Sequence, residues 1–320
     1  MSDPDFSELL LHDSEAHSAS SCGALSSFET EHLQDLQMTL LDLPWEQVLC
    51  SHILPYLSTK DLFYLRSVSR GCQALVQTHF HLQFHVNTNS IGDRFTPEAF
   101  CTMTRDSTCL RTLCLRGAKS WLTSDILLPV IAANSRLEKI DLTGCLALSG
   151  VVVYSIGVNC KSLRHLCLEN CVGLVLDNFL SLMQDQSCLE FLDLSGCWNL
   201  DDDLVVQLVP FMPRLKHLLL ANLYGLTDRS IVAIAHNCRS LIHLSIRGCW
   251  RVTDSAIKLL SQYCQKLKGL QVRDCRNITE ESLVALWSRK VRIDRPQPLS
   301  SDRFKLEMEA DNPLRIRLVL

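Results

Sequence analysis

A pattern of leucines that returns at almost constant intervals constrains the fold of this chain more than any other feature. Each copy has Leu, Ile or Val at its first, fourth and sixth positions, as in the phrase LEFLDLSGC (189–197). The copies begin at Leu110, Leu137, Leu163, Leu189, Leu215, Leu241 and Leu267, first 27 residues apart and then 26 residues apart five times. The pattern therefore predicts one short strand in every unit of a repeating array.

A second phrase with helical spacing follows the strand phrase, as in LTDRSIVAIAHNC (226–238) and VTDSAIKLLSQYC (252–264). Thr227 and Thr253 fit the N-cap position, and the acid after each lies where the helix dipole favours it. A fixed period in the twenties with this strand phrase indicates leucine-rich repeats. One unit cannot bury its apolar face alone, so the units must stack. We therefore predict an α/β solenoid, a horseshoe with short parallel strands on the concave face and helices on the convex face.

Cysteines fall in two columns of this array. One column ends the strand phrase and the other lies near the helix ends: Cys145, Cys171, Cys197, Cys249 and Cys275, then Cys160, Cys238 and Cys264. A small, poorly hydrated side chain fits the turn between strand and helix without steric cost. A metal or redox ladder is the alternative, but buried structural cysteines explain both columns without further assumptions. We expect no metal and no cofactor.

Composition bears on location and partners. The formal charge of −4 argues against nucleic acid or an anionic membrane as the main partner. No apolar run approaches the ~18 residues that span a bilayer. The first residues carry acids where a signal peptide would carry Lys or Arg. We expect a soluble protein of the cytoplasm, with the nucleus as a second location, that binds neither nucleic acid nor membrane.

The chain ahead of the repeats is organised differently. Residues 1–38 are rich in Ser, Asp and Glu without a sustained period, which predicts a disordered acidic tail. Residues 39–80 predict three short helices, with Pro44 in the first turn of one and a Ser58–Asp61 capping box opening the next. These helices are too few to hold a core of their own. Their apolar residues therefore predict a partner surface, a helix packed against a groove, unless they pack on the first repeat.

The segment 39–80 resembles an F-box. The matching positions are Leu43, Pro44, Glu46, Asp61, Leu62, Val68 and Arg70, while Cys72 stands where an aromatic residue is common. With the cysteine-containing repeats directly behind it, the chain resembles the family of F-box and leucine-rich-repeat proteins over roughly residues 41–294. On this basis 39–80 is the F-box, 81–109 a degenerate cap repeat, 110–294 the repeats and 295–320 a polar tail.

The resemblance implies a function without bond chemistry. An F-box protein docks on the Skp adaptor, and through it on the cullin and RING subunits of an SCF-type ubiquitin ligase, and its repeats capture a protein substrate for ubiquitination. The expected adaptor contacts are Leu43, Pro44, Val48, Ile53, Leu54, Leu57, Leu62 and Leu65. The alternative is a leucine-rich-repeat scaffold or inhibitor that acts without the adaptor. Catalysis is not expected, because His165 and Cys167 would stand side by side without a third orienting group.

The substrate is expected on the strand face. Residues that flank the middle leucine should point into the concavity. They form one column of Thr112, Lys139, His165, Phe191, His217, His243 and Gly269, and a second of Cys114, Asp141, Cys167, Asp193, Leu219, Ser245 and Gln271. In the first column, Phe191, His217 and His243 are the candidate contacts; the histidines either make binding sensitive to pH or form a solvated wall.

Three aromatic residues share one position after the strand phrase in successive repeats: Trp198, Tyr224 and Trp250. Stacked repeats should bring their rings into one row. Either each ring covers its own turn, or the row supplies rigid anchors for the substrate.

Overall fold

A computed structural model describes residues 39–89, 95–174 and 188–295, together with the backbone of residues 305–308 and 316–319. The chain divides into two compact units, one up to Leu163 and one from Arg164 onward, which are described separately. The acidic segment 1–38 lies outside the described residues, as do residues 175–187. No helix among the described residues is both long and apolar enough to cross a bilayer.

The first unit opens with short helices. They are η2 (Leu40–Asp42), η3 (Trp45–Ile53), η4 (Leu54–Tyr56), α1 (Thr59–Val68) and α2 (Arg70–Leu82). The expected capping box begins α1, since the Asp61 N–H donates to the Ser58 hydroxyl and the Ser58 N–H donates to the Asp61 carboxylate. Helix η3 is a π-helix, wound more loosely than the sequence predicts, and it ends before Pro55, which has no N–H to continue it.

Helix α2 joins these helices to the repeats of the first unit. Its apolar face buries Leu75, Val76 and Phe80, and the Phe80 ring lies 5.8 Å from that of Phe63 on α1. The strands and helices that follow are β1 (His85–Asn87), α3 (Pro97–Thr104), β2 (Thr112–Cys114), α4 (Ser124–Ala133), β3 (Lys139–Asp141) and α5 (Gly150–Asn159). Strand β2 pairs in parallel with β1 on one side and with β3 on the other.

The second unit repeats the same module. Its elements are β4 (His165–Cys167), β5 (Phe191–Asp193), α7 (Asp202–Leu208), η7 (Val209–Phe211), β6 (His217–Leu219), α8 (Asp228–Asn237), β7 (His243–Ser245), α9 (Asp254–Tyr263), β8 (Gly269–Gln271), α10 (Glu280–Ser288) and β9 (Arg292–Ile293). The six strands pair in parallel in chain order. Strands β10 (Lys305–Met308) and β11 (Ile316–Val319) form a separate antiparallel pair.

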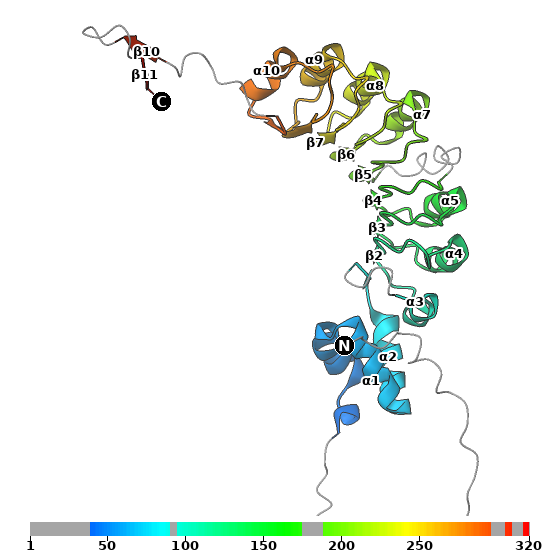
Figure 1. The fold of residues 1–320 in the computed structure, drawn as a ribbon. Coiled ribbons are helices and arrows are strands. Elements are labelled where there is room, and N and C mark those ends of the chain that lie inside the picture. The colour runs from blue at the N-terminus through cyan, green and yellow to red at the C-terminus, as the bar shows by residue number, and fades with distance from the viewer. Residues whose placement is uncertain (1–38, 90–94, 175–187, 296–304, 309–315, 320) are drawn as a thin grey trace, which may run out of the picture. The chain divides into compact units, whose positions relative to one another are not determined.

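Within each unit the strands lie on one side and the helices on the other (Figure 1). The predicted α/β leucine-rich-repeat fold, with parallel strands backed by helices, is confirmed. The leucines of the strand phrase fill the space between the two layers: Leu189, Leu192 and Leu194 are almost wholly buried, and the other copies behave alike. Each such side chain contributes about 1.5–3 kcal/mol when it is removed from water.

The cysteines at the end of the strand phrase connect one repeat to the repeat before it. Each thiol donates a hydrogen bond to a main-chain carbonyl roughly one repeat earlier. The pairs are Cys145 with Leu115 in the first unit, then Cys197 with Leu168, Cys249 with Leu220 and Cys275 with Ile246 in the second, at 3.0–3.3 Å. The position therefore requires a small side chain that also donates a weak hydrogen bond, which is what a buried thiol supplies.

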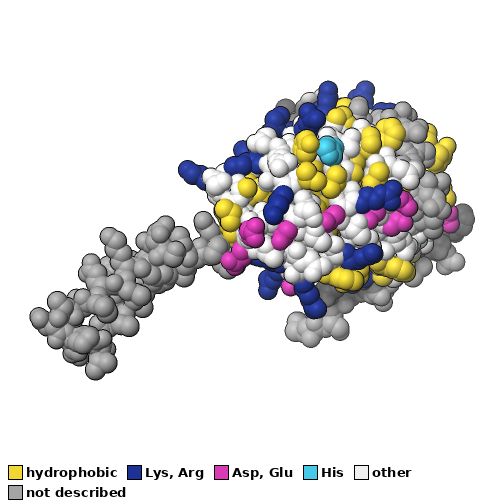
Figure 2. Space-filling view, turned by 90° about the horizontal axis from the view of Figure 1, so that it is seen from above, with side chains coloured by type: hydrophobic (Ala, Val, Ile, Leu, Met, Phe, Trp, Pro, Cys, Tyr) yellow, Lys and Arg dark blue, Asp and Glu magenta, His cyan; other side chains and the backbone are white. Residues whose placement is uncertain are grey.

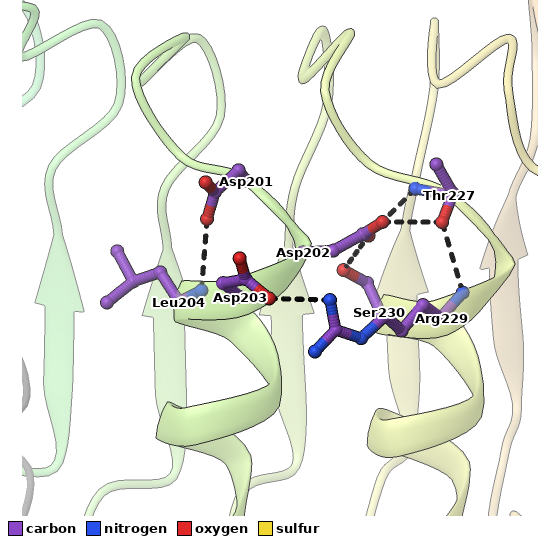
Figure 3. Close-up of polar contacts among 7 residues, drawn as sticks. All are labelled: Asp201, Asp202, Asp203, Leu204, Thr227, Arg229 and Ser230. Atoms are coloured by element: carbon purple, nitrogen blue, oxygen red, sulfur yellow. Dashed lines mark hydrogen bonds and ion pairs between the residues drawn. The ribbon is translucent and has the colours of Figure 1, made fainter.

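Carboxylates connect neighbouring helices in the second unit. Asp202, in the first turn of α7, accepts hydrogen bonds from the N–H and hydroxyl of Thr227 and from the hydroxyl of Ser230 in the next repeat (Figure 3). Asp228 holds Thr253 in the same way, and Asp254 holds Thr279. The Thr-Asp pairs thus do more than begin their own helices, because each acid also fixes the start of the next one.

The turns after strands β4 to β8 each contain one residue with positive φ. Asn and Gly alternate at this position, in the order Asn170, Gly196, Asn222, Gly248, with Asp274 last. Asn and Asp tolerate this conformation better than other residues with a side chain. The Asn222 side chain lies over Gly248, where an added Cβ would come within 2.6 Å of its Oδ1, and Asn170 lies over Gly196 similarly. Glycine at these two positions accommodates the positive φ and also leaves room for the asparagine side chain of the preceding repeat.

Candidate functional site

The helices before the repeats carry exposed apolar side chains. Tyr56 is 87% exposed and Val68 is 71% exposed, and Ile53, Leu57 and Tyr64 are exposed as well. These five residues, here called the helical patch, come from η3, η4, α1 and the turn between them. A surface of this kind on so small a helical segment is typical of a protein-binding site.

The expected adaptor contacts divide between this surface and the core. Pro44, Ile53 and Leu57 are exposed, and Leu43, Val48 and Leu65 are half-buried. Leu54 and Leu62 are 1% and 5% exposed, so in the free chain they belong to the core and not to the exposed surface. Both line the floor of a hollow of about 740 Å³ beside β1, where they support the helices instead. Helical periodicity marks apolar positions but does not show which side of a short helix is covered.

Helix α2 packs on the cap segment 81–109, which is close to the alternative that these helices pack on the first repeat. The Gln77 amide donates to the carbonyl of Thr102, and the Gln83 amide to that of Met103, both on α3. The Ser107 hydroxyl donates to the carbonyl of Phe80. One helix is therefore committed to the repeats, and the helical patch on η3, η4 and α1 is left exposed.

The first predicted column of the strand face forms a row of rings in the second unit. His165, Phe191, His217 and His243 are paired in register on β4 to β7. Their ring centroids are separated by 5.9, 5.8 and 5.0 Å in turn. The next residue in the column is Gly269, and the His243 ring occupies the space where a side chain at that position would stand. Phe191, His217 and His243 thus lie together, half-buried or exposed, on one continuous surface.

Beside this column lie charged residues that the sequence analysis did not predict as part of the site. Glu190 lies between Arg164 and Lys216, with N–O distances of 3.1 and 2.7 Å. The hydrogen bond from Lys216, together with both positive charges, lowers the pKa of Glu190. Burial lowers the pKa of His217, and His243 and His165 lower it further, so His217 is neutral at pH 7. Arg164, Glu190 and Lys216 each come one position before a residue of the ring column. Because parallel repeats pair at equivalent positions, their sequence positions alone would have predicted that they lie side by side.

The second predicted column is mostly closed to a partner. Cys114, Asp141, Cys167, Asp193 and Ser245 are buried, and only Leu219 and Gln271 are accessible. The Asp193 carboxylate turns back to accept a hydrogen bond from the N–H of Ser195, which removes it from the surface. The expectation that both flanking columns open to solvent is therefore wrong for this one, because its polar side chains bond to their own turns.

Trp198, Tyr224 and Trp250 form what is here called the aromatic row. Their residues are 63%, 57% and 49% exposed. Side chains that served only to cover their own turns would be much less exposed, so this favours the interpretation of the row as an interaction surface. The row and the ring column lie on the same unit, at opposite ends of the strand phrase.

The buried thiols are expected to be unreactive near neutral pH. Burial raises the pKa of Cys160, Cys238 and Cys249 to about 12, and that of Cys197, Cys264 and Cys275 to about 11. The thiolate, which is the form that binds metals and attacks disulfides, is therefore not populated near neutral pH. Thiols that stay protonated suit the structural role described above.

The fold and these surfaces define a leucine-rich-repeat protein with a helical segment ahead of the repeats. No protein-family model matches the chain. The chain is, however, 35% identical over 121 residues to F-box/LRR-repeat protein 15 of the mouse, and equally to that of the rat. These alignments cover 38% of this chain and about two fifths, 40%, of the length of the curated relatives. The resemblance to the F-box and leucine-rich-repeat family is confirmed.

Two solved structures are similar in outline. A chain from the yeast Rad7 and Elc1 complex is 19% identical, with a TM-score of 0.46, over 66% of this chain and 62% of that one. The leucine-rich repeat-containing protein LegL7 of Legionella pneumophila is 14% identical, with a TM-score of 0.43, over 66% of this chain and 73% of its own. Likenesses at this level have no bearing on function.

Proposed function

We propose that the chain is the substrate-recognition subunit of an SCF-type ubiquitin ligase. Its helical segment would dock on the Skp adaptor, and its repeats would hold a protein substrate. The observation that carries the proposal is the helical patch: five exposed apolar side chains on a segment that matches the F-box positions, directly ahead of the repeats. The family resemblance supplies the identity of the partner.

The mechanism follows from proximity. Such a subunit breaks no bond, and it raises the local concentration of a substrate lysine beside the conjugating enzyme. The helical patch supplies large apolar groups that lose contact with water when a partner covers them. The ring column and the aromatic row are the surfaces proposed for the substrate, and the cytoplasm or nucleus is the proposed location.

The test is co-purification of the full chain with the Skp adaptor. Leu57→Asp places a charge in the helical patch and should abolish binding, and Leu43→Ala with Pro44→Ala should weaken it. Val284→Asp is the matched control, because Val284 is an exposed apolar residue on α10 in the second unit. Far-UV circular dichroism should show that all variants keep their repeats folded.

Two results would contradict the proposal. One is adaptor binding that survives Leu57→Asp at full strength. The other is loss of binding in Val284→Asp as well as in the patch variants, which would point to general misfolding. A chain that never binds the adaptor, but still captures protein partners through its repeats, would instead be the scaffold or inhibitor that is the alternative.

A further inference from the structure

The aromatic row borders an open hollow. A space of about 640 Å³ is lined by Asn222, Tyr224, Gly248, Trp250, Asp274 and Arg276. The ring contacts found in the described part of the second unit involve other side chains, so the three rings of the row do not stack on one another. Gly248 adds no side chain to the space between Tyr224 and Trp250. The row therefore presents separate ring faces with room between them.

We propose that the aromatic row binds a proline-rich segment of a protein partner in the polyproline II conformation. Neighbouring strands lie about 4.8 Å apart, so Trp198 and Trp250, two repeats apart, are separated by roughly 10 Å. A polyproline II helix rises about 3.1 Å per residue, so residues i and i+3 lie about 9 Å apart on the same side. Prolines three residues apart can then pack on Trp198 and Trp250, with Tyr224 beneath the residues between them.

The polar groups of the row suit the same ligand. Polyproline II has no internal hydrogen bonds, so its carbonyl groups need donors from outside. Within the described part of the chain, the indole N–H groups of Trp198 and Trp250 and the hydroxyl of Tyr224 form no hydrogen bond, so each can donate to a ligand. Aromatic grooves combined with such donors are the recognised way of binding proline-rich segments.

The distribution of charge along the aromatic row predicts the orientation of the bound peptide. Arg251 and Arg276 are exposed beside Trp250 and form no ion pair with a described residue, and Asp274 is the one acid lining the hollow. The surplus of positive charge lies at one end of the row, because Asn199 and Gly225 hold the positions equivalent to Arg251 in the two preceding repeats. The proline-rich segment should therefore carry an acidic residue at the end that meets Trp250.

Single-stranded nucleic acid is the other ligand that stacks on aromatic rows. The surface does not favour it. On the face drawn in Figure 2, Lys and Arg side chains are interspersed with hydrophobic, acidic and uncharged ones. Asp274 lines the hollow itself and opposes a phosphate backbone there. Because Arg251 and Arg276 could also attract phosphates, oligothymidylate is included in the experiment as the competing ligand.

The experiment is a titration of the full chain with synthetic peptides, followed by calorimetry and tryptophan fluorescence. The probe is decaproline with two aspartates at one end, and the control peptide has alternating glycine and serine in place of proline. We expect binding of the proline peptide only, and at least tenfold weaker binding to Trp198→Ala and to Trp250→Ala. Tyr154→Ala, an exposed aromatic residue of α5 in the first unit, should bind normally.

Further variants keep the test decisive. Tyr224→Phe retains the ring and the fold and removes one donor, so binding should weaken severalfold even where a tryptophan variant fails to fold. Moving the aspartates to the other end, or replacing Arg276 by Ala, should separate the two peptide directions. Equal binding of the glycine–serine peptide, undiminished binding by all row variants, or tighter binding of oligothymidylate would overturn the proposal.

The inference rests on the proposed function only for the partner's role as a substrate. Peptide binding is measured without the adaptor, and the adaptor is measured with variants of the helical patch in the first unit. Failure of the peptides to bind would therefore remove the polyproline assignment and leave the ligase proposal standing. Loss of the adaptor interaction would do the reverse.

Discussion

Replacing Asp202 by alanine should destabilise the second unit more than any other single acid-to-alanine change in the first turn of α7. Asp202 accepts three hydrogen bonds from the next repeat: from the Thr227 N–H at 2.9 Å, from the Thr227 hydroxyl and from the Ser230 hydroxyl. Hydrogen bonds to a carboxylate contribute about 1.5–3 kcal/mol each when buried. Because Asp202 is partly exposed, we take about 1 kcal/mol for each bond, and expect a loss of about 3 kcal/mol.

Asp203 is the matched control in the same turn. Its recorded contact is an ion pair with Arg229, and the two side chains are 65% and 61% exposed. A pair so open to solvent contributes less than about 1 kcal/mol. Both acids lie in the first turn of α7 and interact alike with its dipole, so the difference between Asp202→Ala and Asp203→Ala reports on the partly buried hydrogen bonds that Asp202 accepts from Thr227 and Ser230.

The assay is equilibrium unfolding of the full chain in guanidinium chloride, followed by far-UV circular dichroism. Nearest-neighbour coupling in a repeat array should make the Asp202→Ala transition earlier and broader than that of Asp203→Ala. Burial raises the pKa of Asp202, but the hydrogen bonds from Ser230 and Thr227 outweigh it and leave the pKa lowered. The stability that Asp202 contributes is therefore present above pH 3.8 and is lost as the pH falls through the lowered pKa. Equal losses for the two variants at pH 7 would refute this reasoning.

Three further changes test other parts of the array. Burial raises the pKa of Cys249 from 9.0 to about 12, so its contribution is full below pH 9 and declines by about 1.4 kcal/mol per pH unit as the pH rises toward 12. Cys249→Ala should be less stable at pH 7 and should lose that slope in unfolding curves. Gly196→Ala should cost about 1–2 kcal/mol because φ is +70° and Asn170 lies over it, and adding Asn170→Gly should recover part of the loss in the same assay. Phe191→Ala with His217→Ala should reduce substrate capture in a pull-down without changing adaptor binding, and an unchanged yield of substrate would place the site elsewhere.

Much of the repeat architecture is predictable from the sequence. The leucine spacing predicts a strand in each unit and hence the register that brings His165, Phe191, His217 and His243 together, because parallel strands of a repeat array pair at equivalent positions. The positions of the aromatic row follow from the same count. Periodicity alone is sufficient to predict these positions because every unit repeats the same strand, turn and helix.

Contacts between repeats are harder to predict. The bond between Cys249 and the Leu220 carbonyl joins residues 29 positions apart, and a sequence pattern shows only that the side chain is small. The Thr227–Asp202 contact is similar, since an acid after an N-cap threonine is already explained by its own helix. In each case a local reason for the residue is sufficient, so nothing in the pattern suggests a second partner.

The surface of the helical segment is the least predictable part. Leu54 and Leu57 are three residues apart, yet one is buried and the other exposed, because η3 ends there and a short 3₁₀ turn redirects the chain at Pro55. Spacing rules assume one continuous helix, so they place both residues on one face. The prediction that Asp193 lies on the accessible strand face is wrong for a related reason. Its short polar side chain accepts a hydrogen bond from its own turn, which strand alternation does not predict.

The alternation of asparagine and glycine in the turns of the second unit limits how this array can change in length. Each asparagine side chain lies against a glycine of the following repeat, where an added Cβ would displace it. Loss of the unit that carries Gly196 would bring Asn170 and Asn222 into adjacent turns, whereas loss of the unit that carries Asn222 would bring two glycines together, an order that Gly117 and Gly144 already have in the first unit. A change of two units keeps a glycine after every asparagine. A chimera joined after Asn170 or Asn222 should therefore accept a donor array most readily when the first turn of the donor carries glycine.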